Sequence, residues 1–408
     1  MPIFILSLFL PTFIYNRSIY DTSNLTAYIA IISLLVILIN IVQIKKIDTS
    51  LFKYIFPFFL LFIVGTTTSI LRNYELINIL NRAMPVLFFC SGYILITSYN
   101  LLGYNNKFII QLFFYLSIFS AIYSVTFAFN YYEFSLIEAR YQVLPNTANF
   151  LISFFCASYI LNIKKFNGYL CLLFFLFAVL ISATRTYLLL TVIIFFVSIL
   201  IKNKFNLFKT FLIFFIFSFI IGIIIFVFQD SLLISKFNER ILVYQYLGYD
   251  PTFNSRLFES IKQLNMLTNN LSGFLFGYGF LSPIDIFGYG LDKSGSITDA
   301  TTHGYGHNLY VGLFYVSGFL VGLSCLYVFL SSLLNIKFLF IKKLISNNNI
   351  SSDEKFLKIF FYLVFISYLI INIFGVTLGS KTSSFYFGIS LGVIRIIFKE
   401  KKTIDSSN

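Results

Sequence analysis

Charged side chains are scarce in this sequence: Asp, Glu, Lys and Arg make up 11% of its 408 residues. An ordinary soluble domain carries about 25%. Hydrophobic residues reach 58%, and phenylalanine alone contributes 55 residues. This deficit of charge excludes a soluble globular enzyme, a disordered protein and a nucleic-acid-binding domain. The apolar stretches are long and unbroken, which also excludes an outer-membrane barrel. We therefore expect an all-α protein that crosses a membrane several times.

Cysteine and recognisable catalytic signatures are scarce as well. The four cysteines lie in apolar stretches, and they are interpreted as small core residues, not as a disulfide framework or a metal site; they are Cys90, Cys156, Cys171 and Cys325. The sequence contains no Walker motif, nucleophile elbow or Ser-His-Asp arrangement, and no cofactor is expected. The opening MPIFILSLFLPTFIY lacks the basic start of a cleavable signal peptide, so we expect a first membrane segment there.

Twelve apolar stretches are candidate membrane spans, since a bilayer core takes about 20 residues of helix. The first, fourth and last are short, which leaves the number open by one or two. The stretches cover approximately residues 2–15, 24–44, 52–71, 84–99, 108–130, 146–163, 167–184, 186–201, 207–228, 308–335, 356–376 and 383–398. They predict four parts: an N-terminal transmembrane bundle (1–228), a long external loop with short helices (229–307), C-terminal transmembrane helices (308–398) and a cytoplasmic tail (399–408).

The basic residues predict the orientation, because cytoplasmic loops of membrane proteins collect Lys and Arg. With a cytoplasmic N-terminus, the inner side holds 17 Lys and one Arg, and the outer side holds four Lys and seven Arg. We therefore expect both termini inside and the long loop outside. The guanidinium group binds phosphate through two parallel hydrogen bonds. The outer arginines thus indicate an external site for a phosphate or pyrophosphate, although Arg17 and Arg240 are explained as well by pairing with acids or lipid headgroups.

Two arginines stand in motifs that suit such a site. Arg185 lies in SATRTYLL, between two apolar stretches, where a cation is costly and usually functional. The alternative is that its side chain extends to the lipid headgroups. Arg140 lies in EARYQVLPNTANFL, where Pro145 breaks the chain and Asn146 can cap a helix. A helix N-terminus at the outer face would favour an anion.

The segment NSRLFESIKQLNML predicts a helix in the long loop. We expect Ser255 to cap it and Leu257, Ile261 and Leu264 to form its apolar side, so that the helix lies in or near the membrane interface. Arg256 would then fall in the first turn, beside the free backbone amides. The alternative is a helix packed on the bundle with Arg256 in solvent.

Both histidines of the chain lie in TTHGYGHNLYVGLFYVSGFLVG. His307 and Asn308 stand where the long loop re-enters the membrane, and an imidazole there can act as a general base near neutral pH. The alternative is a histidine that only anchors the chain by hydrogen bonds. A metal-binding stripe with His303 would need a helix, which Gly304 and Gly306 oppose, so no metal is expected.

In this order, these motifs resemble the O-antigen polymerase and O-antigen ligase superfamily of bacterial membrane glycosyltransferases. The resemblance covers essentially the whole chain as topology. It is carried by Ala183-Thr184-Arg185, by Arg140 with Pro145-Asn146-Thr147-Ala148, by Arg256 with Gly277-Tyr278-Gly279, and by His307-Asn308 with Gly318 and Gly322. Ser317 stands where ligase-like members have an acid, which favours a polymerase.

The resemblance implies about twelve transmembrane helices in a glycosyltransferase-C-like fold and a metal-independent, inverting transfer at the outer face of the bacterial inner membrane. The donor would be an oligosaccharide on undecaprenyl pyrophosphate, and the acceptor would be the sugar of another lipid-linked repeat of an O-antigen or capsule. Membrane lipids are further expected partners, and a chain-length regulator is left open. The implied residues are His307 as base, Arg185 and Arg256 as catalytic pyrophosphate clamps, and Arg140, Arg72, Arg82, His303, Tyr305 and Asn308 as substrate-binding residues.

Other functions stay open at this point. A ligase would transfer the glycan to the lipid A core of lipopolysaccharide by the same chemistry. A flippase for lipid-linked oligosaccharides would also have about twelve spans, but its cations should line the middle of the spans. A secondary transporter predicts an inverted repeat, which the sequence does not show. A structural scaffold leaves the outer arginines unexplained, and Glu133 with Glu138 leaves a metal-dependent oligosaccharyltransferase weakly open.

Overall fold

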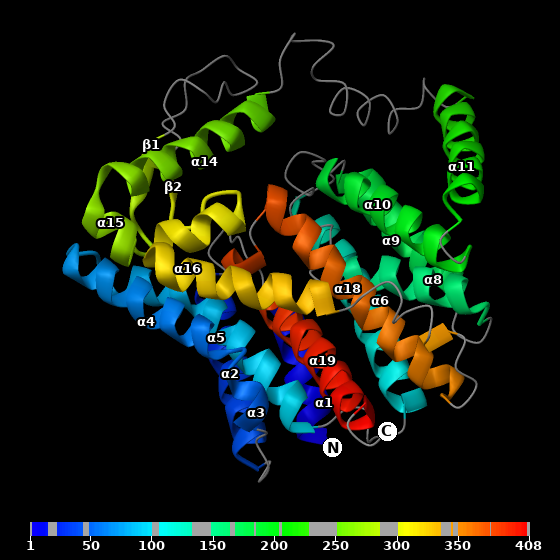
Figure 1. The fold of residues 1–408 in the computed structure, drawn as a ribbon, viewed down its shortest axis with the longest axis horizontal. Helices are drawn as coiled ribbons and strands as arrows, with labels where there is room; N and C mark the ends of the chain where they lie inside the picture. Colours follow the sequence, from blue (N-terminus) through cyan, green and yellow to red (C-terminus); the bar gives the residue numbers. More distant parts are fainter. Residues whose placement is uncertain are drawn as a thin grey trace. The chain divides into compact units, whose positions relative to one another are not determined.

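The computed structural model describes residues 2–14, 23–43, 49–99, 106–132, 148–163, 168–182, 185–203, 206–227, 251–285, 301–335, 344–345, 350–375 and 377–405. These residues are overwhelmingly helical, and within them the strands form one antiparallel pair (Figure 1). The expectation of an all-α protein is therefore met, apart from this short pair.

The helices follow the apolar stretches of the sequence, because a chain in lipid must satisfy its backbone hydrogen bonds internally. Each predicted stretch overlaps a helix. The helices are α1 (Pro2–Phe9), η1 (Leu10–Phe13), α2 (Ser23–Gln43), α3 (Thr49–Phe52), α4 (Phe56–Leu71), α5 (Leu76–Tyr99), α6 (Asn106–Tyr132), α8 (Ala148–Leu161), α9 (Gly168–Ser182), α10 (Arg185–Lys202), α11 (Leu207–Val227), α14 (Pro251–Asn269), α15 (Leu271–Phe276), α16 (Leu309–Asn335), α18 (Ser352–Phe374), η3 (Thr377–Gly379) and α19 (Lys381–Asp405). The strands are β1 (Pro283–Asp285) and β2 (Thr301–His303).

Within the described residues, four helices are long and apolar enough to cross a membrane, namely α5, α6, α16 and α18. Several others are apolar but shorter. Apolar helices of this kind are typical of a membrane protein.

Three boundaries differ from the sequence-based expectation. Helix α5 begins at Leu76, about two turns before the predicted span, and it continues through Pro85. Helix α14 begins at Pro251, so Ser255 lies inside the helix and does not cap it, and Arg256 lies beyond the first turn. Helix α19 continues to Asp405, so most of the predicted tail is helical.

The chain forms two compact units, each built from separate pieces of sequence. The first comprises Met1–Leu101, Tyr249–Asn335 and Tyr368–Asn408, and the second comprises Leu102–Gly248 and Ile336–Ser367. The four consecutive parts that the sequence suggested, which rest on membrane topology, stay a prediction. The described residues of the long loop belong to the first unit.

Phenylalanine forms the core of both units. In the first unit, Phe58 of α4, Phe89 of α5, Phe329 of α16 and Phe387 of α19 pack together, with ring centroids 4.4 Å apart for Phe58 and Phe89 and 5.1 Å apart for Phe329 and Phe387. This cluster joins four helices. In the second unit, a similar cluster joins α6, α8 and α18 through Phe113, Phe150, Phe154, Phe356, Phe360 and Phe361.

Glycines bring α5 and α19 into backbone contact. Gly388 and Gly392 of α19 are four residues apart, the small-xxx-small spacing that lets membrane helices approach closely. A Cβ atom on Gly388 would overlap the carbonyl oxygen of Phe89, and one on Gly92 of α5 would overlap the carbonyl oxygen of Phe385. The two helices therefore pack with main chain against main chain.

Helix α16 is broken at Gly318, whose φ of 78° is not helical. The loop segment after α15 fills the break: the amides of Tyr278 and Gly279 donate to the carbonyls of Tyr315 and Val316, at 2.7 and 3.1 Å. Because these bonds satisfy backbone groups freed by the break, the non-helical backbone is accommodated inside the protein. The apolar stretch around residues 308–335 thus contains two helical segments, not one straight span.

Replacing Gly318 by alanine is expected to lower the melting temperature of the purified protein strongly. Gly318 has φ 78° and ψ 177°, a region that essentially only glycine adopts, so another residue there costs about 1–3 kcal/mol. A Cβ would also overlap the carbonyl oxygen of Leu275. The matched control is Gly375→Ala, whose Cβ would meet only Ile371 atoms, at 3.5 and 3.8 Å. Thermal unfolding in detergent compares the two, and equal melting temperatures would contradict the proposed close contact.

Candidate functional site

The site begins with two polar residues that the sequence reasoning did not single out, Glu259 and Gln263. They lie four residues apart on α14, on the face opposite the apolar stripe. Glu259 is 1% exposed and Gln263 is fully buried, whereas Leu257 is 50% exposed. The helix therefore turns its carboxylate and amide toward the protein and its leucine side outward.

The turn that leads into α16 closes over these two side chains. Gly304 and Gly306 have φ values of 68° and 64°, so the glycines that opposed a helix here do form a turn. Gln263 Nε2 donates to the carbonyl oxygen of Gly304 at 3.1 Å. A Cβ on Gly306 would stand 2.7 Å from Oε1 of Glu259, so the backbone can approach the carboxylate only because residue 306 is a glycine.

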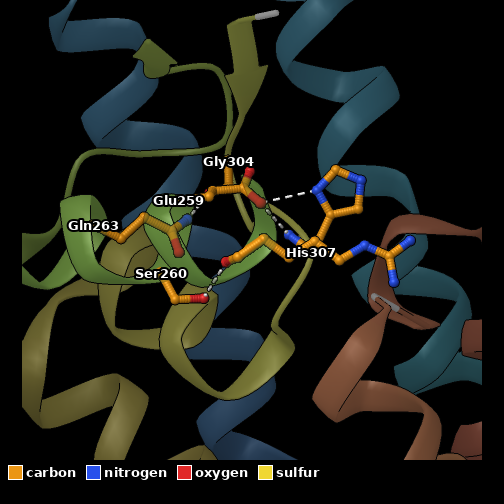
Figure 2. Close-up of polar contacts among 6 residues, drawn as sticks. Glu259, Ser260, Gln263, Gly304 and His307 are labelled. Carbon is orange, nitrogen blue, oxygen red and sulfur yellow. Dashed lines mark hydrogen bonds and ion pairs between the residues drawn. The ribbon is translucent and has the colours of Figure 1, made fainter. Parts of the chain in front are cut away.

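His307 and Glu259 form a hydrogen-bonded pair at the centre of the site. The backbone amide of His307 donates to Oε2 of Glu259 at 3.1 Å, and Nδ1 of the ring lies 2.8 Å from the same oxygen (Figure 2). An ionised carboxylate only accepts hydrogen bonds, so Nδ1 carries the proton and Nε2 remains an acceptor. The His307 side chain is 44% exposed, and the carboxylate is buried. The arrangement therefore presents one free ring nitrogen from a fixed imidazole.

Glu259 Oε1 and Gln263 Oε1 are both buried, without a hydrogen-bond partner among the described residues. Among the described residues, the carboxylate thus makes its hydrogen bonds to His307 through Oε2 alone. Burying a carboxylate is costly unless it is hydrogen-bonded, and the backbone amide of His307 supplies one such bond.

Two predicted sugar-binding residues have structural tasks. Asn308 caps α16, because its Oδ1 accepts from the amides of Tyr310 and Val311 at 3.0 and 3.3 Å. Tyr305 is 6% exposed and stacks edge-on against Phe280. Burial raises the pKa of the Tyr305 phenol well above its usual value. Tyr305 is therefore a core residue in this structure, and its expected contact with sugars stays a prediction.

Arg72 and Arg82 lie at the same end of the first unit as His307. Arg72 follows α4, is exposed, and holds its guanidinium 4.5 Å from the ring centroid of Tyr278, in the segment that fills the break in α16. Arg82 is exposed on α5, next to Asn81, whose Oδ1 accepts from Nζ of Lys381 at 2.9 Å. The end of α4 and the beginnings of α5, α16 and α19 therefore bring cations to one end of the unit.

For the other predicted site residues, the structure gives mainly their positions in the helices and strands. Arg256 is half-buried on α14, one turn before Glu259, and its carbonyl oxygen accepts from Ser260 Oγ at 3.0 Å. His303 ends β2, with its backbone paired opposite Pro283. Arg185 begins α10 in the second unit. Arg140, Glu133, Glu138, Pro145 and Asn146 lie outside the described residues.

A faint signal for Glu259 was present in the sequence. Within NSRLFESIKQLNML, an acid and an amide at i and i+4 stand opposite a stripe of leucine and isoleucine. That spacing marks a second face of the helix. It does not say that this face meets a histidine 48 residues further along the chain.

A scan of the chain against models of known protein families finds no match, and a search of curated proteins finds no similar sequence.

Proposed function

We propose that the protein is a membrane glycosyltransferase that polymerises lipid-linked repeat units of an O-antigen or capsular polysaccharide. The observation that carries the proposal is the pair of Glu259 and His307, with a buried carboxylate on Nδ1 and a half-exposed imidazole. This pairing orients the ring and stabilises the imidazolium that forms when Nε2 takes a proton. It is the arrangement that a general base needs.

In the proposed reaction, a hydroxyl of the acceptor sugar attacks the anomeric carbon of a glycan on undecaprenyl pyrophosphate. The new glycosidic bond forms as the bond from that carbon to the pyrophosphate oxygen breaks, and the configuration inverts. The hydroxyl proton goes to Nε2 of His307. The bonding electrons leave with the lipid pyrophosphate, which gains negative charge in the transition state.

The arginines have the complementary task in this proposal. Arg256, one turn before Glu259 on α14, and Arg185 at the start of α10 are proposed to stabilise the leaving pyrophosphate, with Arg140 as a further clamp. Arg72 and Arg82 are proposed to attract the anionic substrate to the same end of the first unit, where they are exposed. His303 stays a proposed substrate contact, and Asn308 contributes by fixing the turn beside His307.

The proposal includes a bacterial inner membrane, about twelve spans in a glycosyltransferase-C-like arrangement, both termini in the cytoplasm and residues 229–307 outside. The cations at the loop end of the first unit support a site at the outer face. Ser317, in place of the acid of ligase-like relatives, favours a polymerase over a ligase.

The proposal is tested with purified protein in lipid and an undecaprenyl-pyrophosphate-linked repeat unit as the substrate. We expect a ladder of lipid-linked products on a gel, unchanged by a chelator of divalent cations. Transfer only to an added lipid A core, without a ladder, would make the protein a ligase. Intact donor after incubation with folded protein would overturn the transferase and favour a flippase.

A further inference from the structure

Helix α14 exposes an apolar stripe on the side away from Glu259. Its members lie three or four residues apart, and their exposed fractions are 50% for Leu257, 45% for Ile261 and 45% for Leu264. Leu267, on the inner side of the same helix, is only 5% exposed and packs beside Ile284 and Tyr315. The apolar stripe is therefore left over after the helix has packed on its own unit.

The stripe continues onto α15. Leu271 is 74% exposed, Leu275 40% and Phe276 60%. Helix α15 packs directly against the break in α16, where the rings of Phe274 and Phe319 stack at 4.9 Å. Beyond the break, α16 exposes Phe319, Leu320 and Leu323.

Helices α14, α15 and α16 pack against one another (Figure 1), so we treat their exposed apolar residues as one face. We call it the α14–α16 face, and it comprises Leu257, Ile261, Leu264, Leu271, Leu275, Phe276, Phe319, Leu320 and Leu323.

We propose that the α14–α16 face is covered by phospholipid, with α14 lying at the boundary between headgroups and acyl chains. The continuity of the face with α16 carries this choice of partner. The segment of α16 after Gly318 also exposes Tyr327, Leu330 and Leu334, with Ser324 as a small polar residue among them. Lipid that covers this side of α16 would also reach α15 and α14, which pack against α16 and against each other.

The side chains of α14 also suit a helix that lies at the boundary between headgroups and acyl chains. Amphipathic helices at an interface bury their apolar face about 5–10 Å into the headgroup and acyl boundary and keep cations on the flank. Lys262 lies on such a flank, with Nζ 6.0 Å from the ring centroid of Phe258. The stripe ends in polar side chains, because Asn254 lies three residues before Leu257 and Thr268 four residues after Leu264, and both are exposed.

This placement fixes the height of His307 in the membrane. Glu259 and Ile261 are two residues apart on one rigid helix, so the carboxylate that holds His307 lies within one helix diameter, about 10–12 Å, of the lipid-covered stripe. The imidazole would therefore stand at the level of lipid headgroups. The inference concerns lipid contact alone, and it holds whichever reaction the site performs.

The chain lacks tryptophan, so a single introduced indole reports on one position without background. The variant is Ile261→Trp, reconstituted in phosphatidylcholine vesicles that contain lipid with a nitroxide either near the headgroup or near the chain end. Leu330→Trp on α16 is the reference for the acyl region. Ser352→Trp, at the exposed and polar start of α18, is the reference for water.

We expect the indole of Ile261→Trp to be quenched at least about twofold more by the shallow nitroxide than by the deep one, and to be shielded from aqueous iodide. Strong iodide quenching without lipid quenching would overturn the proposal and make the face solvent-exposed. Shielding from both quenchers, dependent on the protein-to-lipid ratio, would overturn it in favour of a second copy of the chain.

Leu257→Trp and Leu264→Trp keep the test decisive if Ile261→Trp does not fold. Both positions lie on the same stripe with similar exposure, so they should show the same preference for the shallow nitroxide. Elution from a sizing column at the wild-type volume establishes folding for each variant before quenching is measured.

Discussion

Replacing His307 by alanine is expected to abolish nearly all turnover of the lipid-linked donor. A positioned general base contributes about 10²–10⁴-fold to a reaction of this kind, and His307 is the one described side chain whose ring is held by a buried carboxylate while a nitrogen stays open. The measurement is the initial rate of donor consumption at saturating substrate. Removing the imidazole leaves the buried carboxylate of Glu259 with only the backbone amide of residue 307, so the melting temperature should fall as well, and the rate is compared on protein that still elutes as folded.

The substitution Glu259→Gln separates the charge of the pair from its hydrogen bonds. The amide oxygen of glutamine can accept from the His307 amide and from Nδ1 as the carboxylate does, so the geometry is preserved. It carries no charge to stabilise the imidazolium, and we expect a rate loss of about 10²-fold or more with little change in KM. Ser260→Ala, the neighbouring residue that bonds only within its own helix, is the matched control.

The combined variant tests whether the two residues act as one unit. If Glu259 works through His307, then Glu259→Gln should cost nothing further once His307 is alanine, because groups that act together are not additive. A multiplicative loss in the double variant would show two independent roles. A single Glu259→Gln variant with the wild-type rate would remove the general-base assignment altogether.

Replacing Gly388 by leucine is expected to separate α5 from α19 and to cost about 3 kcal/mol or more of folding free energy, the upper end of the range for overpacked cores. A Cβ there would overlap the carbonyl oxygen of Phe89 and lie 3.1 Å from the amide nitrogen of Tyr93. Both are backbone atoms, so no side chain can rotate away. Unfolding by denaturant or heat in detergent, followed by circular dichroism, gives the loss.

Gly222→Leu is the control for replacing a helical glycine by leucine where no other atoms are close. Gly222 lies in α11, and a Cβ there meets nothing within 4 Å. Leucine is about 1 kcal/mol better than glycine in a helix interior, so this variant should be as stable as the wild type or more stable. If Gly388→Leu and Gly222→Leu unfolded alike, the backbone contact between α5 and α19 would not hold in solution.

The sequence predicted the helices well because their cause is local. The twelve apolar stretches each coincided with a helix. Polar Asn78, Asn81 and Arg82 hid the first turns of α5, and the polar end of α19 was missed. Helix α14 was indicated by its amphipathic pattern, and α15 was not indicated. The glycines at 304 and 306 correctly indicated a turn. By contrast, Ser255 was misassigned as a cap, because Pro251 starts the helix earlier.

The candidate site was predicted in part. His307 stood out by its rarity and its place at a re-entry point, and the structure gives its ring a buried carboxylate partner. Asn308 and Tyr305 were chosen because polar and aromatic side chains suit sugars, but the local fold uses one as a helix cap and the other as core. The cap by Asn308 is a local contact with amides two and three residues further on, which sequence can indicate. The ring of Tyr305 meets Phe280 only after folding, which sequence cannot indicate.

By itself, the sequence determined that this protein is built from apolar helices, since hydropathy is a property of each stretch alone. Only the tertiary structure decided that Glu259 meets His307, that the segment at 277–279 fills a break at Gly318, and that Gly388 touches the backbone of Phe89. Each of these contacts joins residues far apart in the chain. They depend on which helix faces meet when the core packs, and no local pattern specifies that choice.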